Sequence, residues 1–221
     1  RTDGKENLIT ALEIAADKDE EGKAIVPELC VYMQNLLMRG NRTTKINSEN
    51  FSAFNSPNYP ALAEVGIDIR YHDQFILQPD YNKPTVFNFN IDNNVAVLKL
   101  FPGIQKNVVE SYLSIPNLKG VVLETFGSGN ALRDQWFVDA LETAIAKGVV
   151  IVNVTQCLYG SVEMHRYGTG QHLEKLGLVS GHDITTETAL AKLMLLQGNG
   201  FTSEEITRLM EVSLRGELSL R

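Results

Sequence analysis

Residues 119–154 read KGVVLETFGSGNALRDQWFVDALETAIAKGVVIVNV, and this stretch decides the fold. Its apolar run at 119–124 passes through a glycine-rich loop into a segment with helical character at 132–147, and a second apolar run follows at 149–154. Two buried strands joined by a helix form a crossover unit, in which the strands lie parallel in one sheet. The stretch therefore predicts an α/β fold built around a parallel sheet.

The same alternation extends in both directions from this stretch. Strands that alternate with helices imply a parallel sheet with helices on both of its faces. We therefore expect residues 95–221 to form an α/β domain. Its further expected elements are a strand at 95–100 and helices at 105–114, near 170–176, at 186–197 and at 203–214.

The beginning of the chain also combines helix and strand signals. Asp3 can cap the first helix, which carries Leu8 and Leu12 on one face. A helix followed by a strand is half of an α/β unit, so we expect residues 1–72 to be part of a second α/β domain. The expected elements are a helix from Gly4 to Asp17 and strands at 28–34 and 67–71.

Residues 73–94 differ from both flanking regions. They contain two prolines and five asparagines and show no helical period. Such a composition is typical of a linker, or of an irregular strand that crosses between two domains. We therefore predict an interdomain linker at 73–94.

Composition narrows the class of protein. The 221 residues carry a formal net charge of −7, whereas nucleic-acid-binding domains are more often basic, so no nucleic-acid partner is expected. No apolar run approaches the roughly 20 residues that span a bilayer, and no signal peptide is recognisable, so no membrane partner is expected. Cys30 and Cys157 lie in apolar contexts and are expected to be reduced thiols of a cytoplasmic protein.

The histidines do not suggest a metal centre. His72, His165, His172 and His182 show none of the spacings typical of zinc sites, and we expect them to be solvated surface residues. No metal and no cofactor are therefore expected.

The stretch RGNRTTK at 39–45 is a cationic, polar loop that follows an apolar run. Its Lys45 is either a surface residue or a lysine that polarises a hydroxyl beside a carboxylate. Arg39 and Arg42 either orient the loop or are simply solvated. The residues alone leave both pairs of alternatives open.

The loop FGSGNAL at 126–132 also allows two interpretations. Its backbone N–H groups can cradle an anion at the start of a helix, or the glycines can form a tight turn between strand and helix. A dinucleotide site would need a third glycine and an acidic residue roughly 20 positions later, and this sequence has neither. A nucleotide cofactor is therefore not expected.

Several segments together are similar to one enzyme family. RTDGKENLITALEIAA, LLMRGNRTTKINSENFSAFNSPNYPALAEVGIDI, LKLFPGI, TFGSGNA, VVIVNVTQCL, YGTG and LRGEL resemble, in order and spacing, the type I (cytoplasmic) bacterial L-asparaginases. The resemblance covers essentially the whole chain. It implies the end of a larger N-terminal α/β domain that bears the active site, followed by the complete smaller C-terminal domain. The implied substrate is L-asparagine, which such enzymes hydrolyse to L-aspartate and ammonia without a cofactor.

The resemblance also implies roles for individual residues. Lys45 matches the lysine of the catalytic triad, and Thr44 precedes it in the same loop. Asn130 matches a residue that reaches the neighbouring subunit's substrate pocket, which implies a homodimer or homotetramer. Thr44 and Cys157 also match an asparagine effector site, but Glu124 stands where that site has an arginine. A carboxylate there would repel an amino-acid effector by about 1 kcal/mol or more.

Two catalytic segments of the family do not occur in this sequence. Neither Thr-Gly-Gly-Thr-Ile, with the nucleophile, nor Gly-Thr-Asp-Thr is present, since the single Thr-Gly is Thr169-Gly170 and the single Thr-Asp is Thr2-Asp3. The chain therefore resembles the last two-thirds of the enzyme, and we expect these 221 residues alone to be inactive. Alternatives are an asparaginase-like subunit of a tRNA-dependent amidotransferase and a non-catalytic α/β binding domain.

Overall fold

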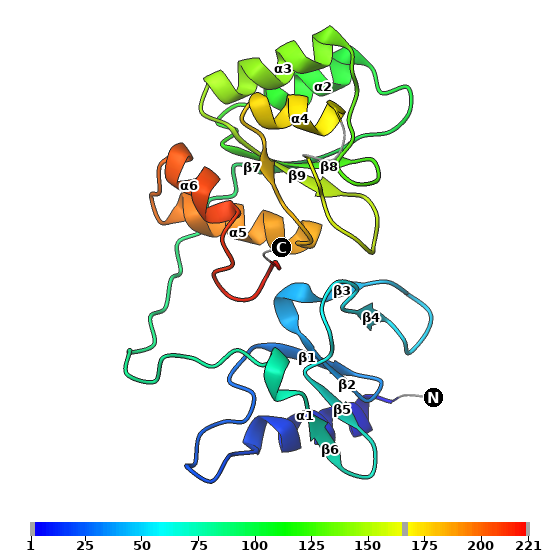
Figure 1. Cartoon of the computed structure of the whole chain (residues 1–221), viewed down its shortest axis with the longest axis vertical. Helices are drawn as coiled ribbons and strands as arrows, with labels where there is room; N and C mark the ends of the chain where they lie inside the picture. The colour runs from blue at the N-terminus through cyan, green and yellow to red at the C-terminus, as the bar shows by residue number, and fades with distance from the viewer. Residues whose placement is uncertain (1–2, 165–167, 220–221) are drawn as a thin grey trace. The chain divides into compact units, whose positions relative to one another are not determined.

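The computed structural model describes residues 3–164 and 168–219 (Figure 1). The chain divides into two compact units, Arg1–Thr85 and Val86–Arg221. The boundary between these units lies inside the segment 73–94.

The second unit contains a parallel four-stranded sheet in the order β10-β9-β8-β7. Pairing runs in continuous register, with Val121 of β8 opposite both Ala96 and Ile151. The predicted α/β fold with a parallel sheet is thereby confirmed. The strands are β7 (Val95–Lys99), β8 (Gly120–Thr125), β9 (Val150–Thr155) and β10 (Val179–Ser180), the last of which the sequence did not indicate.

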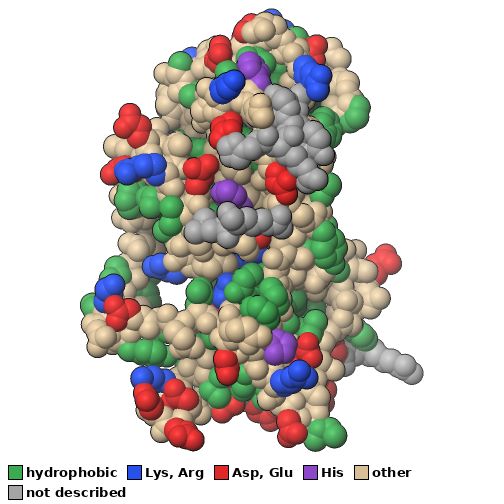
Figure 2. Space-filling view, viewed as in Figure 1, with side chains coloured by type: hydrophobic (Ala, Val, Ile, Leu, Met, Phe, Trp, Pro, Cys, Tyr) green, Lys and Arg blue, Asp and Glu red, His purple; other side chains and the backbone are tan. Residues whose placement is uncertain are grey.

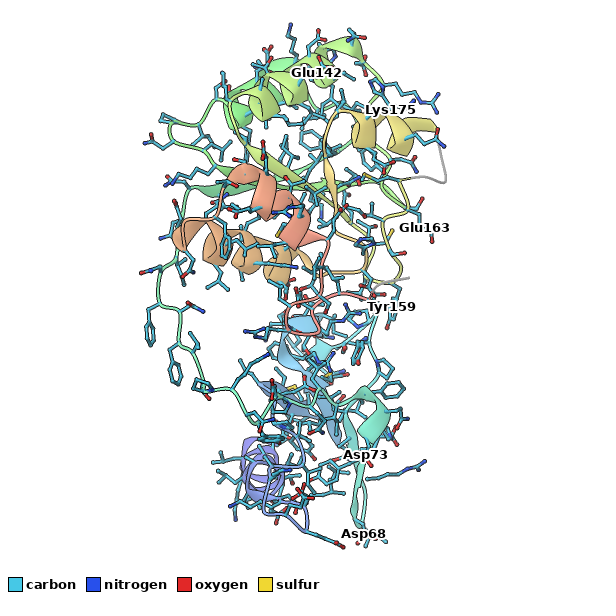
Figure 3. The ribbon with its side chains drawn as sticks, turned by 60° about the vertical axis from the view of Figure 1, so that its left-hand side comes forward. Asp68, Asp73, Glu142, Tyr159, Glu163 and Lys175 are labelled. Atoms are coloured by element: carbon cyan, nitrogen blue, oxygen red, sulfur yellow. The ribbon has the colours of Figure 1, made fainter. Side chains whose placement is uncertain are left out.

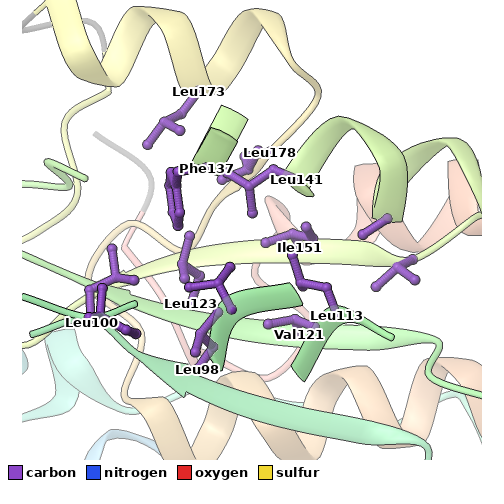
Figure 4. Close-up of a cluster of buried hydrophobic side chains, with 14 of the residues drawn as sticks. Leu98, Leu100, Leu113, Val121, Leu123, Phe137, Leu141, Ile151, Leu173 and Leu178 are labelled. Atoms are coloured by element: carbon purple, nitrogen blue, oxygen red, sulfur yellow. The ribbon is translucent and has the colours of Figure 1, made fainter. Parts of the chain in front are cut away.

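Helices cover both faces of this sheet (Figure 1). Successive β8 side chains alternate between the faces, since Val121 and Leu123 belong to one core and Val122 to the other. Figure 4 shows the core on the side of α2, α3 and α4, where Phe137 and Leu141 pack over β8 and β9. The helices are α2 (Lys106–Leu113), α3 (Gln135–Ala146) and α4 (Gly168–Lys175) on this face, and α5 (Thr186–Gly198) and α6 (Ser203–Met210) on the other.

Helix α6 ends at Met210, earlier than the predicted residue 214. Lys192 of α5 accounts for this, because its Nζ donates to the carbonyls of Met210 (3.2 Å) and Val212 (2.6 Å) and pairs with Glu217 at 2.6 Å. Burial lowers the pKa of Lys192, and Glu217 opposes that effect. The buried ammonium thus directs the chain out of the helix after Met210 and connects the segment up to Glu217 to α5.

The first unit contains a four-stranded sheet that is antiparallel throughout, in the order β1-β2-β5-β6, a topology for which the sequence made no prediction. The chain reverses at Gln34 (φ 51°) and Asn35 (φ 63°), a two-residue hairpin turn in the left-handed region. That turn ends the strand expected at 28–34, and a second strand that was not expected follows it. The strands are β1 (Cys30–Met33), β2 (Leu36–Arg39), β5 (Ala63–Val65) and β6 (Ile69–Tyr71), beside a short pair β3 (Thr44–Lys45) and β4 (Phe54–Asn55).

Helix α1 (Gly4–Ala16) and two 3₁₀ helices, η1 (Gly40–Arg42) and η2 (Asp73–Phe75), complete this unit. Two details of α1 differ from the prediction. The side chain of Asp3 makes no capping hydrogen bond, and Leu8 and Leu12 are 61% and 62% exposed. Ile14 is instead the α1 residue that enters the core of the unit.

The surface of the described residues carries interspersed charges on the face that Figure 2 shows, with apolar side chains between them. None of the helices within 3–164 and 168–219 combines the length and the apolar character needed to cross a membrane.

Candidate functional site

The loop 39–45, called the arginine loop below, is anchored by a buried ion pair. Arg39 ends β2 and is only 2% exposed. Its Nε lies 2.5 Å from Oε2 of Glu28, and its Nη2 donates to Oε1 of Glu28 (3.1 Å) and to the carbonyl of Phe75 (2.8 Å). Burial disfavours the guanidinium charge, but the bonds to Glu28 outweigh it and raise the pKa of Arg39.

An aromatic ring links this ion pair to the second arginine of the loop. The guanidinium carbons of Arg39 and Arg42 lie 4.3 and 5.1 Å from the centre of the Tyr59 ring, within cation–π distance. Arg42 is 2% exposed and donates to the carbonyl of Asn58 at 2.9 Å. The arginines therefore orient the loop and are not solvated. Glu28 and Tyr59 could not be recognised as their partners from the sequence, because Glu28 lies 11 residues before Arg39 and Tyr59 lies 17 residues after Arg42.

Beyond the arginines, the chain enters the two-stranded pair of β3 and β4, where Thr44 lies opposite Asn55 and Lys45 opposite Phe54. Lys45 is exposed, and its Nζ lies 5.1 Å from the centre of the Phe54 ring. Thr44 is partly buried. The first unit therefore presents the Lys45 ammonium at its surface, next to a loop that is held by buried groups.

Residues 126–130, called the glycine turn below, close on themselves. The N–H of Phe126 donates to the carbonyl of Asn130 and the N–H of Asn130 to the carbonyl of Phe126, both at 2.8 Å. Gly127 (φ 51°) and Gly129 (φ 105°) take conformations that favour glycine. Helix α3 begins only at Gln135, later than predicted, so the turn does not lie at a helix start. Of the two interpretations, the tight turn is correct, and it carries Asn130 at its end.

Glu124 and Cys157 both lie at the carboxyl edge of the parallel sheet. The Glu124 carboxylate accepts a hydrogen bond from the hydroxyl of Thr186 at 2.7 Å and lies 3.4 Å from Nζ of Lys99. Cys157 is exposed, and its N–H donates to Oγ1 of Thr155 at 3.0 Å. Thr44 belongs to the other unit, so the structure places two of the three predicted effector-site residues in one unit.

The histidines have separate surroundings. Nδ1 of His72 lies 2.9 Å from the carbonyl of Ala61, His172 is exposed on α4, and His182 is partly buried with φ 52°. His165 lies outside the described residues. In the described part of the chain, no three His, Cys, Asp or Glu side chains are grouped so that they could hold a metal ion.

Two family models match the sequence. The model described as Asparaginase, N-terminal, matches residues 1–77, and the model described as Glutaminase/Asparaginase C-terminal domain matches residues 94–210. The second match alone covers more than half of the chain.

Individual proteins are similar along the same extent. The 60 kDa lysophospholipase of Mus musculus is 40% identical over 99% of the chain and 38% of its own length. L-asparaginase 1 of Escherichia coli K12 is 36% identical over 99% of the chain and 62% of its own length. The crystal structure of L-asparaginase I from Vibrio cholerae superposes with a TM-score of 0.90 at 38% identity, over 100% of the chain and 64% of that structure. The chain thus spans between 38% and 64% of the length of these relatives.

Proposed function

The chain belongs to the glutaminase/asparaginase family, and from this premise we propose that it is part of an amidohydrolase that converts L-asparagine to L-aspartate and ammonia. The observation that carries the proposal is the presentation of Lys45. Its ammonium is exposed at the end of the arginine loop, which two buried guanidinium groups hold in place. A loop fixed in this way can place one charge reproducibly in an active site.

The proposed reaction is an acyl transfer to a threonine. A threonine hydroxyl attacks the side-chain amide carbon of asparagine, ammonia leaves, and water then hydrolyses the resulting ester to aspartate and free threonine. Lys45 stabilises the ionised form of a neighbouring aspartate and lowers the free energy needed to deprotonate the attacking hydroxyl. Thr44 orients the strand that carries Lys45.

Asn130 serves the same reaction from the second unit. We propose that its side-chain amide binds the substrate in the pocket of a neighbouring copy, so that a homodimer or homotetramer is the working form. The enzyme acts in the cytoplasm on a free amino acid and needs no cofactor. The fixed conformation of the glycine turn supports this role, since a substrate-binding side chain gains from a backbone that does not move.

The experiment that tests the proposal adds the nucleophile segment that these 221 residues do not contain. The chain is joined to the part of E. coli L-asparaginase 1 that it does not cover, and ammonia release from L-asparagine is measured for the joined enzyme and for the 221 residues alone. We expect release from the joined enzyme only. Lys45→Ala should abolish that release, and Lys83→Ala, a change to an exposed lysine of the same unit, should leave it unchanged.

Other substrates in the same assay distinguish the alternatives. Release from glutamine only in the presence of a partner protein and tRNA would indicate an amidotransferase subunit. Hydrolysis of a lysophospholipid, the activity named for the mouse relative, would replace the proposal if asparagine were not hydrolysed. A joined protein that folds and hydrolyses none of these would favour a non-catalytic binding domain.

We propose further that asparagine does not activate this enzyme through a second site. The Glu124 carboxylate already has Lys99 and Thr186 as partners, so it has no need of a cationic ligand, and its charge repels the carboxylate of an amino acid. Under this proposal Thr44 and Cys157, which match the other two residues of that site, bind no effector. Initial rates should follow a hyperbola with a Hill coefficient of about 1, and a strongly sigmoidal curve would contradict this proposal.

A further inference from the structure

Every carbonyl in the middle of the glycine turn accepts a hydrogen bond from outside the turn. Thr155 Oγ1 donates to the carbonyl of Gly127 at 2.5 Å, and the N–H of Glu163, labelled in Figure 3, donates to the carbonyl of Ser128 at 2.9 Å. Nδ2 of Asn153 donates to the carbonyl of Gly129 at 3.3 Å. The turn is therefore held at three successive peptide groups.

Asn153 is the most unusual of these donors. It is fully buried in β9, in a strand whose neighbouring residues 150–152 and 154 are all apolar. Its Oδ1 accepts from the hydroxyl of Thr125 at 2.7 Å, and Thr125 is fully buried as well. Burying a neutral amide and a hydroxyl in a core strand is unfavourable unless both are hydrogen-bonded, and here each finds the other.

The spacing within β9 explains how one strand reaches two points of the turn. Asn153 and Thr155 are two residues apart, so their side chains leave the same face of the sheet. One contacts the carbonyl of Gly129 and the other the carbonyl of Gly127. A Cβ added to Gly129 would lie 2.8 Å from Cγ1 of Val162 and 3.2 Å from Nδ2 of Asn153, so the backbone packs directly against the amide.

We propose that Asn153 is a positioning residue that fixes the peptide group between Gly129 and Asn130 and thereby sets the direction of the Asn130 side chain. Thr125 holds the amide of Asn153 in the orientation that points Nδ2 at the turn. The proposal rests on the proposed function only in the role of Asn130 as a substrate-binding residue. The hydrogen bond from Asn153 to the carbonyl of Gly129 is independent of that role.

The first part of the test needs no activity. In the 221-residue chain, hydrogen exchange at the amides of Gly129 and Asn130 is measured by NMR for the original protein, Asn153→Leu and Thr125→Val. Asn153→Leu conserves size but removes the donor to Gly129, and we expect exchange to become about tenfold faster at both amides. Thr125→Val leaves that donor in place but removes the bond that orients it, so we expect a smaller increase in exchange, of about threefold. Unchanged exchange in Asn153→Leu would overturn the proposal.

The second part tests whether Asn153 acts through Asn130. In the joined enzyme, Asn153→Leu should raise the KM for asparagine about tenfold and change kcat less. In an Asn130→Ala background the same substitution should have no further effect on KM, because its route to the substrate is gone. Additive effects of the two substitutions would overturn the proposal. Should Asn153→Leu fail to fold, Asn153→Ser removes the same contact and is measured in the same two ways.

The two parts separate the two proposals. If the joined enzyme with the original Asn153 does not hydrolyse asparagine, the proposed function fails, and the exchange rates still decide whether Asn153 fixes the turn. If hydrolysis occurs but exchange and KM are unaffected in Asn153→Leu, the positioning role fails and the proposed function stands.

Discussion

The arginine loop and the glycine turn are held in place by opposite means. In the proposed function each of them supplies one polar side chain, Lys45 from the first and Asn130 from the second. The arginine loop is held by buried charges, with Arg39 paired to Glu28 and both arginines over one tyrosine ring. The glycine turn is held by neutral donors to its own carbonyls. The difference predicts that the first loop is sensitive to the loss of a charge and the second to the gain of a methyl group.

The largest effect is expected from Glu28→Ala in the first unit. The substitution leaves the Arg39 guanidinium buried without its carboxylate, and breaking a buried pair in this way destabilises a protein by about 3 to 5 kcal/mol. Both side chains are nearly inaccessible, at 3% and 7% exposure, so water cannot replace the partner. Hydrogen exchange of the amides in β1 and β2 measures the loss of the free energy of unfolding.

A matched control shows whether burial is the reason. Asp80→Ala breaks the exposed ion pair with Lys83 in the same unit and should cause no measurable change. Trp136 is the only tryptophan of the sequence and lies on α3, so its fluorescence follows the second unit. We expect Glu28→Ala to leave the Trp136 transition almost unchanged. Equal losses of stability in Glu28→Ala and Asp80→Ala would show that the arginine loop does not depend on a buried charge.

The next effect is expected from Gly129→Ala in the glycine turn. The new Cβ would meet Val162 at 2.8 Å in a backbone conformation with φ 105°, so strain and overpacking add to about 2 to 4 kcal/mol. Gly127→Ala is the control, because it has φ 51° but no atom within 4 Å, and should destabilise by only about 1 kcal/mol. Urea unfolding followed by Trp136 fluorescence measures both, and equal effects would show that packing against Val162 does not matter.

The fold of the second unit was largely predictable, because its strands are continuous apolar runs of the kind that a doubly covered sheet requires. In the first unit the sequence did not indicate how the strands pair. A strand was expected at 28–34, but Gln34 and Asn35 form a hairpin turn without the usual glycine, and β2 follows this turn. Such a turn is difficult to predict from sequence when it has no glycine. Glycine is the residue that most often indicates the positive φ angles of the turn, and asparagine also tolerates them.

The candidate site was predictable in part. The loop that contains Lys45 was recognisable by its positive charges, and the loop that contains Asn130 was recognisable by its glycines. Their supports did not, because Glu28 and Tyr59 are ordinary surface residue types whose burial depends on long-range pairing. Asn153 could have been recognised from the sequence, because it is the single polar residue inside the apolar run VVIVNV. A buried polar residue in a core strand needs a partner, and looking for that partner leads to the glycine turn.

A smaller effect is expected from Thr155→Val, which removes one of the three hydrogen bonds that the carbonyls of the glycine turn accept from outside it. Oγ1 of Thr155 donates to the carbonyl of Gly127 and accepts from the N–H of Cys157, and the site is only partly buried. Loss of such bonds should destabilise the second unit by about 1 kcal/mol in the same urea experiment. Thr155→Ser keeps the hydroxyl and should behave like the original protein. A larger loss in Thr155→Ser than in Thr155→Val would contradict the role of the hydroxyl.

The smallest effect concerns pH and distinguishes the charged loop from the neutral turn. Cys30 of β1 lies opposite Arg39 in the sheet register, and burial, aided by the charge of Glu28 and opposed by that of Arg39, raises the pKa of its thiol from 9.0 to about 12. The unfolded chain then loses the thiol proton at lower pH than the folded one. The stability that this thiol contributes is therefore complete below pH 9 and decreases as the pH rises toward 12.

Cys30→Ala isolates this contribution from that of Tyr71, whose hydroxyl donates to Asp17 and whose pKa is also raised, chiefly by burial. Both proteins are compared between pH 8 and pH 10.5 under reducing conditions, with hydrogen exchange in β1 and β2 corrected for intrinsic rates. The original protein should lose stability with a steeper slope than Cys30→Ala. Parallel slopes would mean that the thiol ionises equally in both states. The surroundings of Cys30 and Arg39 would then be more hydrated than the burial of the ion pair implies. Buried charge would contribute less to holding the arginine loop, and the contrast with the glycine turn would be smaller.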